Sequence, residues 1–141
     1  MAAFTLREHT ADVAVEANGD DLGATFAAVA DGLAAAMCDD WPAADDPDGG
    51  ERADLGIVAE GPEAALYDYL DELIYERDVR AVLPVDNEAH VEGDGEWAVE
   101  ASYRGVPLSA VVAREVKAVT YSEMRLERAD GGWEAYVVFD V

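Results

Sequence analysis

The chain has 141 residues, of which 32 are acidic and 9 are basic, so its formal net charge is −23. This length suits one domain spanning residues 1–141, which can bury a core without a disulfide or a structural metal. The charge argues against extensive direct nucleic-acid binding, because phosphate contacts require clustered Lys and Arg. The carboxylates are spread along a chain of ordinary hydropathy. The composition therefore predicts a folded, halophilic acidic protein in a salt-rich cytoplasm.

The first part of the chain predicts two strands and a helix. Apolar and polar residues alternate at 4–8 and at 13–17, which is typical of strands joined by a short loop. From residue 22 to residue 37, apolar side chains recur at spacings of three or four, as on the buried face of a helix. Asp20 or Asp21 is suited to cap that helix.

A loop, a third strand and a second helix are expected next. The loop covers the acidic segment 39–51, to which we assign no function, and the strand covers 53–60. Pro62 suits the first position of a helix. An apolar stripe from Leu66 to Arg77 predicts its buried face. Four acidic residues are expected on the opposite, solvent-facing side: Asp68, Asp71, Glu72 and Glu76.

The last part of the chain predicts two hairpins. Glycine-containing turns separate strands at 88–92 and 97–103, and again at 119–127 and 133–139. The segment 105–117 is ambiguous between helix and strand. No apolar stretch approaches the roughly 18 residues of a membrane span. The sequence thus predicts an α+β fold with a mainly antiparallel β-sheet and two packed α-helices.

Two anionic groups are expected at the end of the last strand. Asp140 follows the apolar run 136–139, and the α-carboxylate of Val141 lies one residue further on. Such a pair attracts a hard cation and costs several kcal/mol if it is buried unpaired. An edge strand with no special role is the alternative interpretation.

Other motifs give weaker indications of chemistry. A hydrolase would pair His9 with Ser122 and an aspartate, but no nucleophile elbow surrounds Ser122. Zinc is poorly supported, because His9 and His90 do not form a ligand-spaced pair. Lys117 is the only lysine, whereas the other eight basic residues are arginine. A salt bridge to an acidic site or a phosphate contact would explain Lys117, and chance is the alternative.

Four segments taken together resemble the archease family. They are Glu8-His9-Thr10-Ala11-Asp12-Val13, the helical run 69–75, the lysine segment 115–121 and the terminal Phe139-Asp140-Val141. Archeases assist the GTP-dependent RNA ligase that rejoins tRNA halves. The resemblance therefore implies a non-catalytic protein cofactor that promotes guanylylation and multiple turnover of the ligase in tRNA splicing.

The resemblance also implies a set of functional residues. A divalent ion, typically calcium, is expected between Asp12, Asp140 and the carboxylate of Val141. His9 and Lys117 are expected to contribute to ligase activation in roles that the sequence does not assign. Ser122 stands where the family usually has histidine. The alternative function is a small metal-dependent hydrolase or a chaperone-like binding protein.

Overall fold

The computed structural model describes residues 2–9 and 12–141. Within these ranges the chain forms seven strands, two α-helices and one short 3-10 helix. The strands are β1 (Ala3–His9), β2 (Asp12–Gly19), β3 (Glu51–Ala59), β4 (Val82–Asp94), β5 (Glu96–Pro107), β6 (Ala118–Ala129) and β7 (Gly132–Asp140). The helices are α1 (Leu22–Met37), α2 (Pro62–Arg80) and the 3-10 helix η1 (Leu108–Ala110). The α+β class predicted from the sequence is confirmed.

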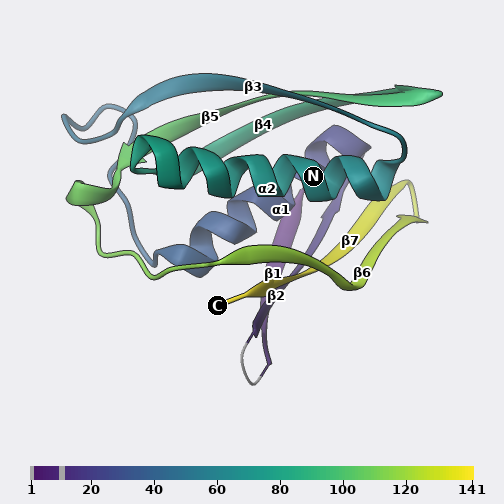
Figure 1. Ribbon diagram of the computed structural model, residues 1–141, viewed down its shortest axis with the longest axis horizontal. Helices are drawn as coiled ribbons and strands as arrows, with labels where there is room; N and C mark the ends of the chain where they lie inside the picture. The colour runs from purple at the N-terminus through teal and green to yellow at the C-terminus, as the bar shows by residue number, and fades with distance from the viewer. Residues whose placement is uncertain (1, 10–11) are drawn as a thin grey trace.

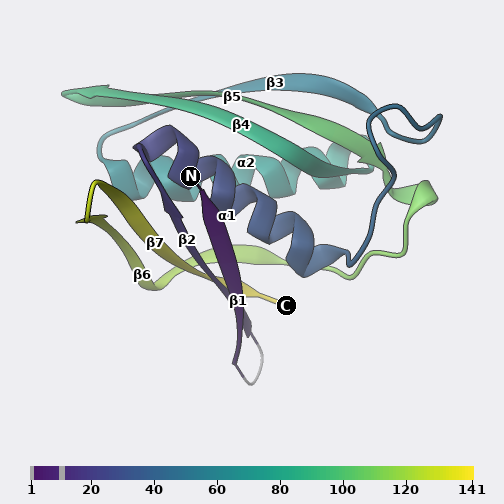
Figure 2. The same ribbon diagram turned by 180° about the vertical axis from the view of Figure 1, so that it is seen from behind.

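The strands form two antiparallel sheets with the helices between them. One sheet has the order β1-β2-β7-β6 and the other has the order β3-β5-β4. Figures 1 and 2 show α1 and α2 sandwiched between these sheets. Sequence periodicity predicts the strands but does not divide them between two sheets, because pairing between distant segments depends on tertiary packing.

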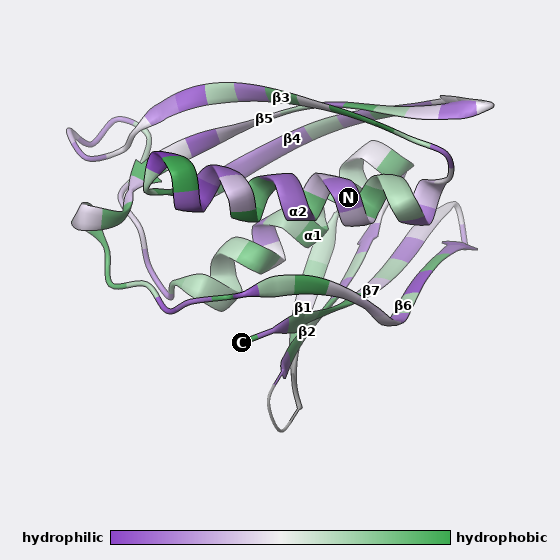
Figure 3. Cartoon of the chain, in the orientation of Figure 1, coloured by the Kyte–Doolittle hydropathy of each residue, from purple (hydrophilic) through white to green (hydrophobic). Residues whose placement is uncertain are grey.

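The core lies between the layers and is supplied by the predicted helix faces. In α1 the whole expected apolar stripe is buried, from Leu22 to Met37. Phe26 of α1 stacks against Tyr69 of α2 with 6.1 Å between ring centroids, and neither side chain is exposed. Figure 3 shows apolar residues along α1 and polar ones mainly along the outer strands. Helical periodicity therefore predicts these faces correctly.

Glu76 departs from the expected solvent-facing position. It is buried, with 7% of its surface exposed, because the helix turns it towards β5 instead of towards water. Its Oε1 accepts a hydrogen bond from the Tyr103 hydroxyl at 2.9 Å and lies 3.1 Å from Arg80. Burial and this carboxylate raise the pKa of Tyr103 to about 12. Two polar partners thus stabilise a carboxylate that the amphipathic pattern placed outside.

The predicted helix starts are confirmed. Asp21 caps α1, and its side chain accepts a hydrogen bond from the backbone N–H of Ala24 at 2.7 Å. Pro62 occupies the first turn of α2. No helix in the described ranges is both long enough and apolar enough to cross a membrane.

The acidic loop after α1 is anchored to the three-stranded sheet. The buried guanidinium of Arg104 donates to the carbonyl oxygens of Pro42 at 2.8 Å and Gly49 at 2.7 Å. The same side chain forms an ion pair with Asp86 at 2.7 Å. The ambiguous segment 105–117 resolves into the end of β5, then η1, then a stretch without regular structure.

Candidate functional site

The strand register brings the two predicted metal-binding aspartates together. Asp12 of β2 lies directly opposite Asp140 of β7. On either side, His9 of β1 is opposite Asp12, and Ala118 of β6 is opposite Asp140. Directly opposed residues in antiparallel strands project from the same face with Cβ atoms about 4.5–5.5 Å apart. The Asp12 and Asp140 side chains are therefore neighbours on one face of the sheet.

This face is the one that points away from the helices. Val15, Val137 and Phe139 belong to the core and line the inner face. Side chains alternate along a strand, so Asp12 and Asp140, which have the opposite parity, lie on the outer face. Asp12 is half-buried and Asp140 is exposed. In Figure 1 the C-terminal end of β7 lies below the helix layer, on the side away from the three-stranded sheet. The acidic pair is open to a ligand or a partner.

The chemistry of the donor set suits a hard divalent cation. Asp12 and Asp140 supply carboxylate oxygens from adjacent strands, and Val141 follows Asp140 with 44% of its surface exposed. Calcium accepts roughly 6–8 oxygen ligands in flexible geometry. No group of three or more His, Cys, Asp or Glu side chains suited to a metal occurs among the described residues. Any ion held by Asp12 and Asp140 would therefore complete its shell with main-chain, solvent or partner oxygens.

Lys117 is tied directly to this site through its backbone. Its N–H donates to the carbonyl oxygen of Asp140 at 2.8 Å. The side chain is exposed, and its ammonium has no hydrogen-bond or ion-pair partner within the described ranges. The structure thus links Lys117 to Asp140 through the backbone, whereas the salt bridge to the acidic site that the sequence analysis considered is not seen in the described part of the chain. The charge of Lys117 is available to an external anion.

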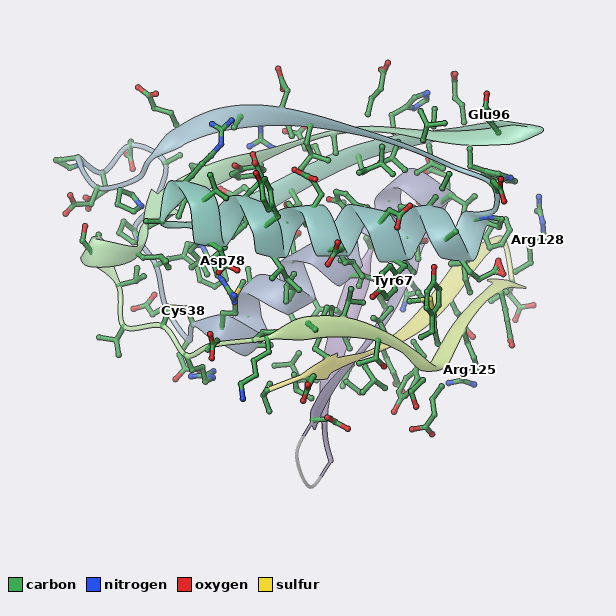
Figure 4. All side chains as sticks on the ribbon, viewed as in Figure 1. Cys38, Tyr67, Asp78, Glu96, Arg125 and Arg128 are labelled. Atoms are coloured by element: carbon green, nitrogen blue, oxygen red, sulfur yellow. The ribbon has the colours of Figure 1, made fainter. Side chains whose placement is uncertain are left out.

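Two arginines that the sequence analysis did not select position the segment before Lys117. Arg77 of α2 is 6% exposed and donates from Nη1 to the carbonyl oxygen of Val116 at 2.7 Å. Arg114 bonds α1 twice, from its backbone N–H to Met37 O at 2.7 Å and from Nε to Ala36 O at 2.8 Å. Figure 4 shows Asp78 and Cys38 at this same end of the helix layer. The sequence contains one indication that Arg77 has a structural role, because it is a charged residue inside the otherwise apolar stripe of α2.

The remaining predicted residues are less closely linked. His9 ends β1, but its side chain and the residues Thr10 and Ala11 lie outside the described part of the chain. Ser122 belongs to β6, and β1 and β6 are the two opposite edges of the sheet. Three strand spacings of about 4.8 Å separate these edges, or about 14 Å. This separation is too large for the hydrolase interpretation, which required His9 to activate Ser122.

Comparison with known sequences gives one consistent result. The profile of the Archease protein family matches residues 4–141. A protein archease from Pyrococcus furiosus is 32% identical over 139 residues, covering 95% of each chain. A protein archease from Archaeoglobus fulgidus is 36% identical over 138 residues, covering 95% of this chain and 96% of the relative.

Solved structures resemble the fold along nearly its whole length. The solution structure of a Methanobacterium thermoautotrophicum protein superposes with a TM-score of 0.77 at 26% identity, covering 99% of both chains. The crystal structure of an archease and possible chaperone from Thermotoga maritima gives a TM-score of 0.64 at 23% identity. It covers 96% of this chain and 94% of the other, and at that identity it supports the fold alone.

Proposed function

Because the chain belongs to the archease family, we propose that it activates the GTP-dependent RNA ligase of tRNA splicing. It acts as a non-catalytic protein cofactor, promoting guanylylation of the ligase and its repeated turnover. The observation that carries this proposal is the opposition of Asp12 and Asp140 on the exposed face of the four-stranded sheet. A charged site on an open face is suited to act on a partner enzyme's active site.

In this proposal Asp12, Asp140 and the α-carboxylate of Val141 hold a divalent cation, with calcium the first candidate. Bound there, the ion would supply positive charge that offsets negative charge on nucleotide phosphates. The two aspartates stand on neighbouring strands whose backbone is held by the sheet ladder, so their oxygens need little reorganisation to bind. The donor set leaves room for oxygens from the ligase or from GTP.

Lys117 adds a positive charge beside the acidic pair. Its backbone is fixed by the hydrogen bond to Asp140, and the neighbouring carbonyl of Val116 is held by Arg77. Only the side chain must become ordered when an anion binds, which limits the entropy lost. We propose that the ammonium contacts a phosphate of the nucleotide, and that His9 borders the same site.

The test is guanylylation of the cognate ligase with labelled GTP, with and without this protein and a divalent ion. The assay is run in molar KCl, because a chain with a net charge of −23 repels itself at low salt. We expect strong stimulation at amounts of protein well below those of the ligase. The protein alone is expected to leave generic phosphoesters intact.

Two results would contradict the proposal. An active ligase that is unaffected by the protein would reject the cofactor role and favour a chaperone-like binding protein. Turnover of phosphoesters by the purified protein alone would favour a hydrolase instead.

A further inference from the structure

The outward surface of α2 carries apolar side chains that no other element covers. Tyr75 and Val79 are four residues apart, so they lie on the same side of the helix. They are 57% and 61% exposed, respectively. Figure 1 shows α2 at the front of the molecule, between the two sheets, and Figure 2 shows α1 on the other side of α2. Adjacent exposed apolar residues of this kind are typical of contact surfaces.

A stacked tyrosine pair extends this surface onto β6. Tyr67 of α2 and Tyr121 of β6 stack with 4.2 Å between centroids and 6° between ring planes, while Tyr121 remains 55% exposed. Figure 4 shows Tyr67 between α2 and β6. The strand bulges here, because β6 has four residues between the pairs formed by Thr120 and Arg125, whereas β7 has one. The bulge brings Tyr121 to the helix.

Carboxylates without cationic partners border these aromatic rings. Asp68, Asp71 and Glu72 lie on the same side of α2, and none forms an ion pair within the described ranges. Burial and the neighbouring carboxylates of Glu76 and Asp71 raise the pKa of Glu72. By contrast, the arginines of α2 itself are paired with other carboxylates, Arg77 with Asp78 and Arg80 with Glu76. Arg52, Arg104 and Arg114, which lie on other parts of the chain, are also paired. Among the described residues, the charges of these three carboxylates are thus not compensated by an ion pair.

We propose that this surface, formed by Tyr67, Asp68, Asp71, Glu72, Tyr75, Val79 and Tyr121, docks onto arginine side chains of the RNA ligase. This proposal rests on the proposed function. An enzyme that binds tRNA halves presents arginine and lysine to their phosphates. A guanidinium stacks on tyrosine rings and bonds carboxylates in a bidentate manner, so it satisfies both kinds of group found here.

The docking surface lies close enough to the acidic pair for one partner to contact both. Ala118 is opposite Asp140, and Tyr121 is three residues further along β6. Three residues of a strand span about 10 Å. An interface of ordinary size, about 800 Å² on each partner, covers that distance easily. The α2 surface would hold the ligase while Asp12 and Asp140 act on it.

The test is the dissociation constant of the ligase complex, measured by biolayer interferometry in molar KCl. Tyr75→Ser combined with Val79→Ser is expected to raise the dissociation constant about tenfold or more. Asp71→Arg is expected to raise it as well. All three substituted residues are exposed, so the fold should persist. Val58→Ser, at a residue 63% exposed on β3, and Glu96→Arg, at the far hairpin, are matched controls expected to stay within about twofold.

The two proposals fail in different ways. If the wild-type protein binds and stimulates the ligase and the α2 variants bind equally well, the docking surface is refuted while the proposed function stands. If the wild-type protein neither binds nor stimulates, the proposed function is refuted and this surface falls with it. In support, saturating amounts of the α2 variants should restore full guanylylation, whereas Asp140→Ala should bind normally and fail to stimulate.

Discussion

Replacing Arg77 with methionine should destabilise the protein by about 2–3 kcal/mol. The guanidinium is buried and donates to the carbonyl oxygen of Val116 at 2.7 Å. Losing a charged hydrogen bond to a buried carbonyl costs roughly 1.5–3 kcal/mol. The ion pair with Asp78 adds about 0–1 kcal/mol, because that partner is 61% exposed. Removing a buried charge offsets part of the loss, and methionine fills most of the volume.

Urea unfolding in molar KCl measures this loss. Arg128→Met is the control, because Arg128 is exposed and contacts Trp133 only by stacking at 4.9 Å, a contact worth about 0.5–1 kcal/mol. The Lys117 amide should also exchange faster in the Arg77 variant, because the segment before β6 loses an anchor. If Arg77→Met destabilises no more than the control, Arg77 does not hold this segment as described.

Three further perturbations test local features of the fold. Asp21→Ala should lower the free energy of unfolding by about 1 kcal/mol, because α1 loses its N-terminal cap. Urea unfolding measures this change, and an unchanged free energy of unfolding would contradict the capping role. Gly50→Ala should cost several kcal/mol by the same assay, because Gly50 has φ +80° and an added Cβ would lie 1.9 Å from the carbonyl oxygen of Gly105. The hydrogen bond to Glu92 raises the pKa of His90 above its ordinary value of 6.5. The stabilisation that protonated His90 gives to the folded state is therefore present below pH 6.5, and it is lost as the pH rises through the pKa of His90 in the folded protein. An NMR titration should show that Glu92→Gln lowers the pKa of His90, and an unchanged value would mean that the bond does not form in solution.

Local patterns predict most of the secondary structure of this chain. The spacing from Leu22 to Met37 identifies α1 and its buried face, and glycine turns locate both hairpins. These patterns depend only on neighbouring residues, and the tertiary structure keeps the secondary structure that they predict. Glu76 was misplaced because an amphipathic pattern assigns charged residues to solvent and carries no information about Tyr103, which lies 27 residues away.

The candidate site was only partly predictable for a related reason. Family resemblance nominated Asp12, Asp140 and Lys117 and implied that the two aspartates share an ion. Local patterns do not show this proximity, because it depends on pairing between β2 and β7, which are distant in sequence, and on the contact of Lys117 with Asp140 where β6 begins to pair with β7. The anchoring of Lys117 by Arg77 and Arg114 depends on packing between α2, α1 and an irregular segment. No periodicity describes such a segment, so the sequence left it ambiguous.

The most direct test of the central claim is the guanylylation rate of the ligase with Asp12→Ala or Asp140→Ala in place of the wild-type protein. Asp130→Ala is the matched control, because Asp130 is also exposed but lies in the turn between β6 and β7. Circular dichroism would establish that each variant is folded. We predict that both site variants lose stimulation and that the control retains it. Normal stimulation by either folded site variant would contradict the claim that the opposed aspartates activate the ligase.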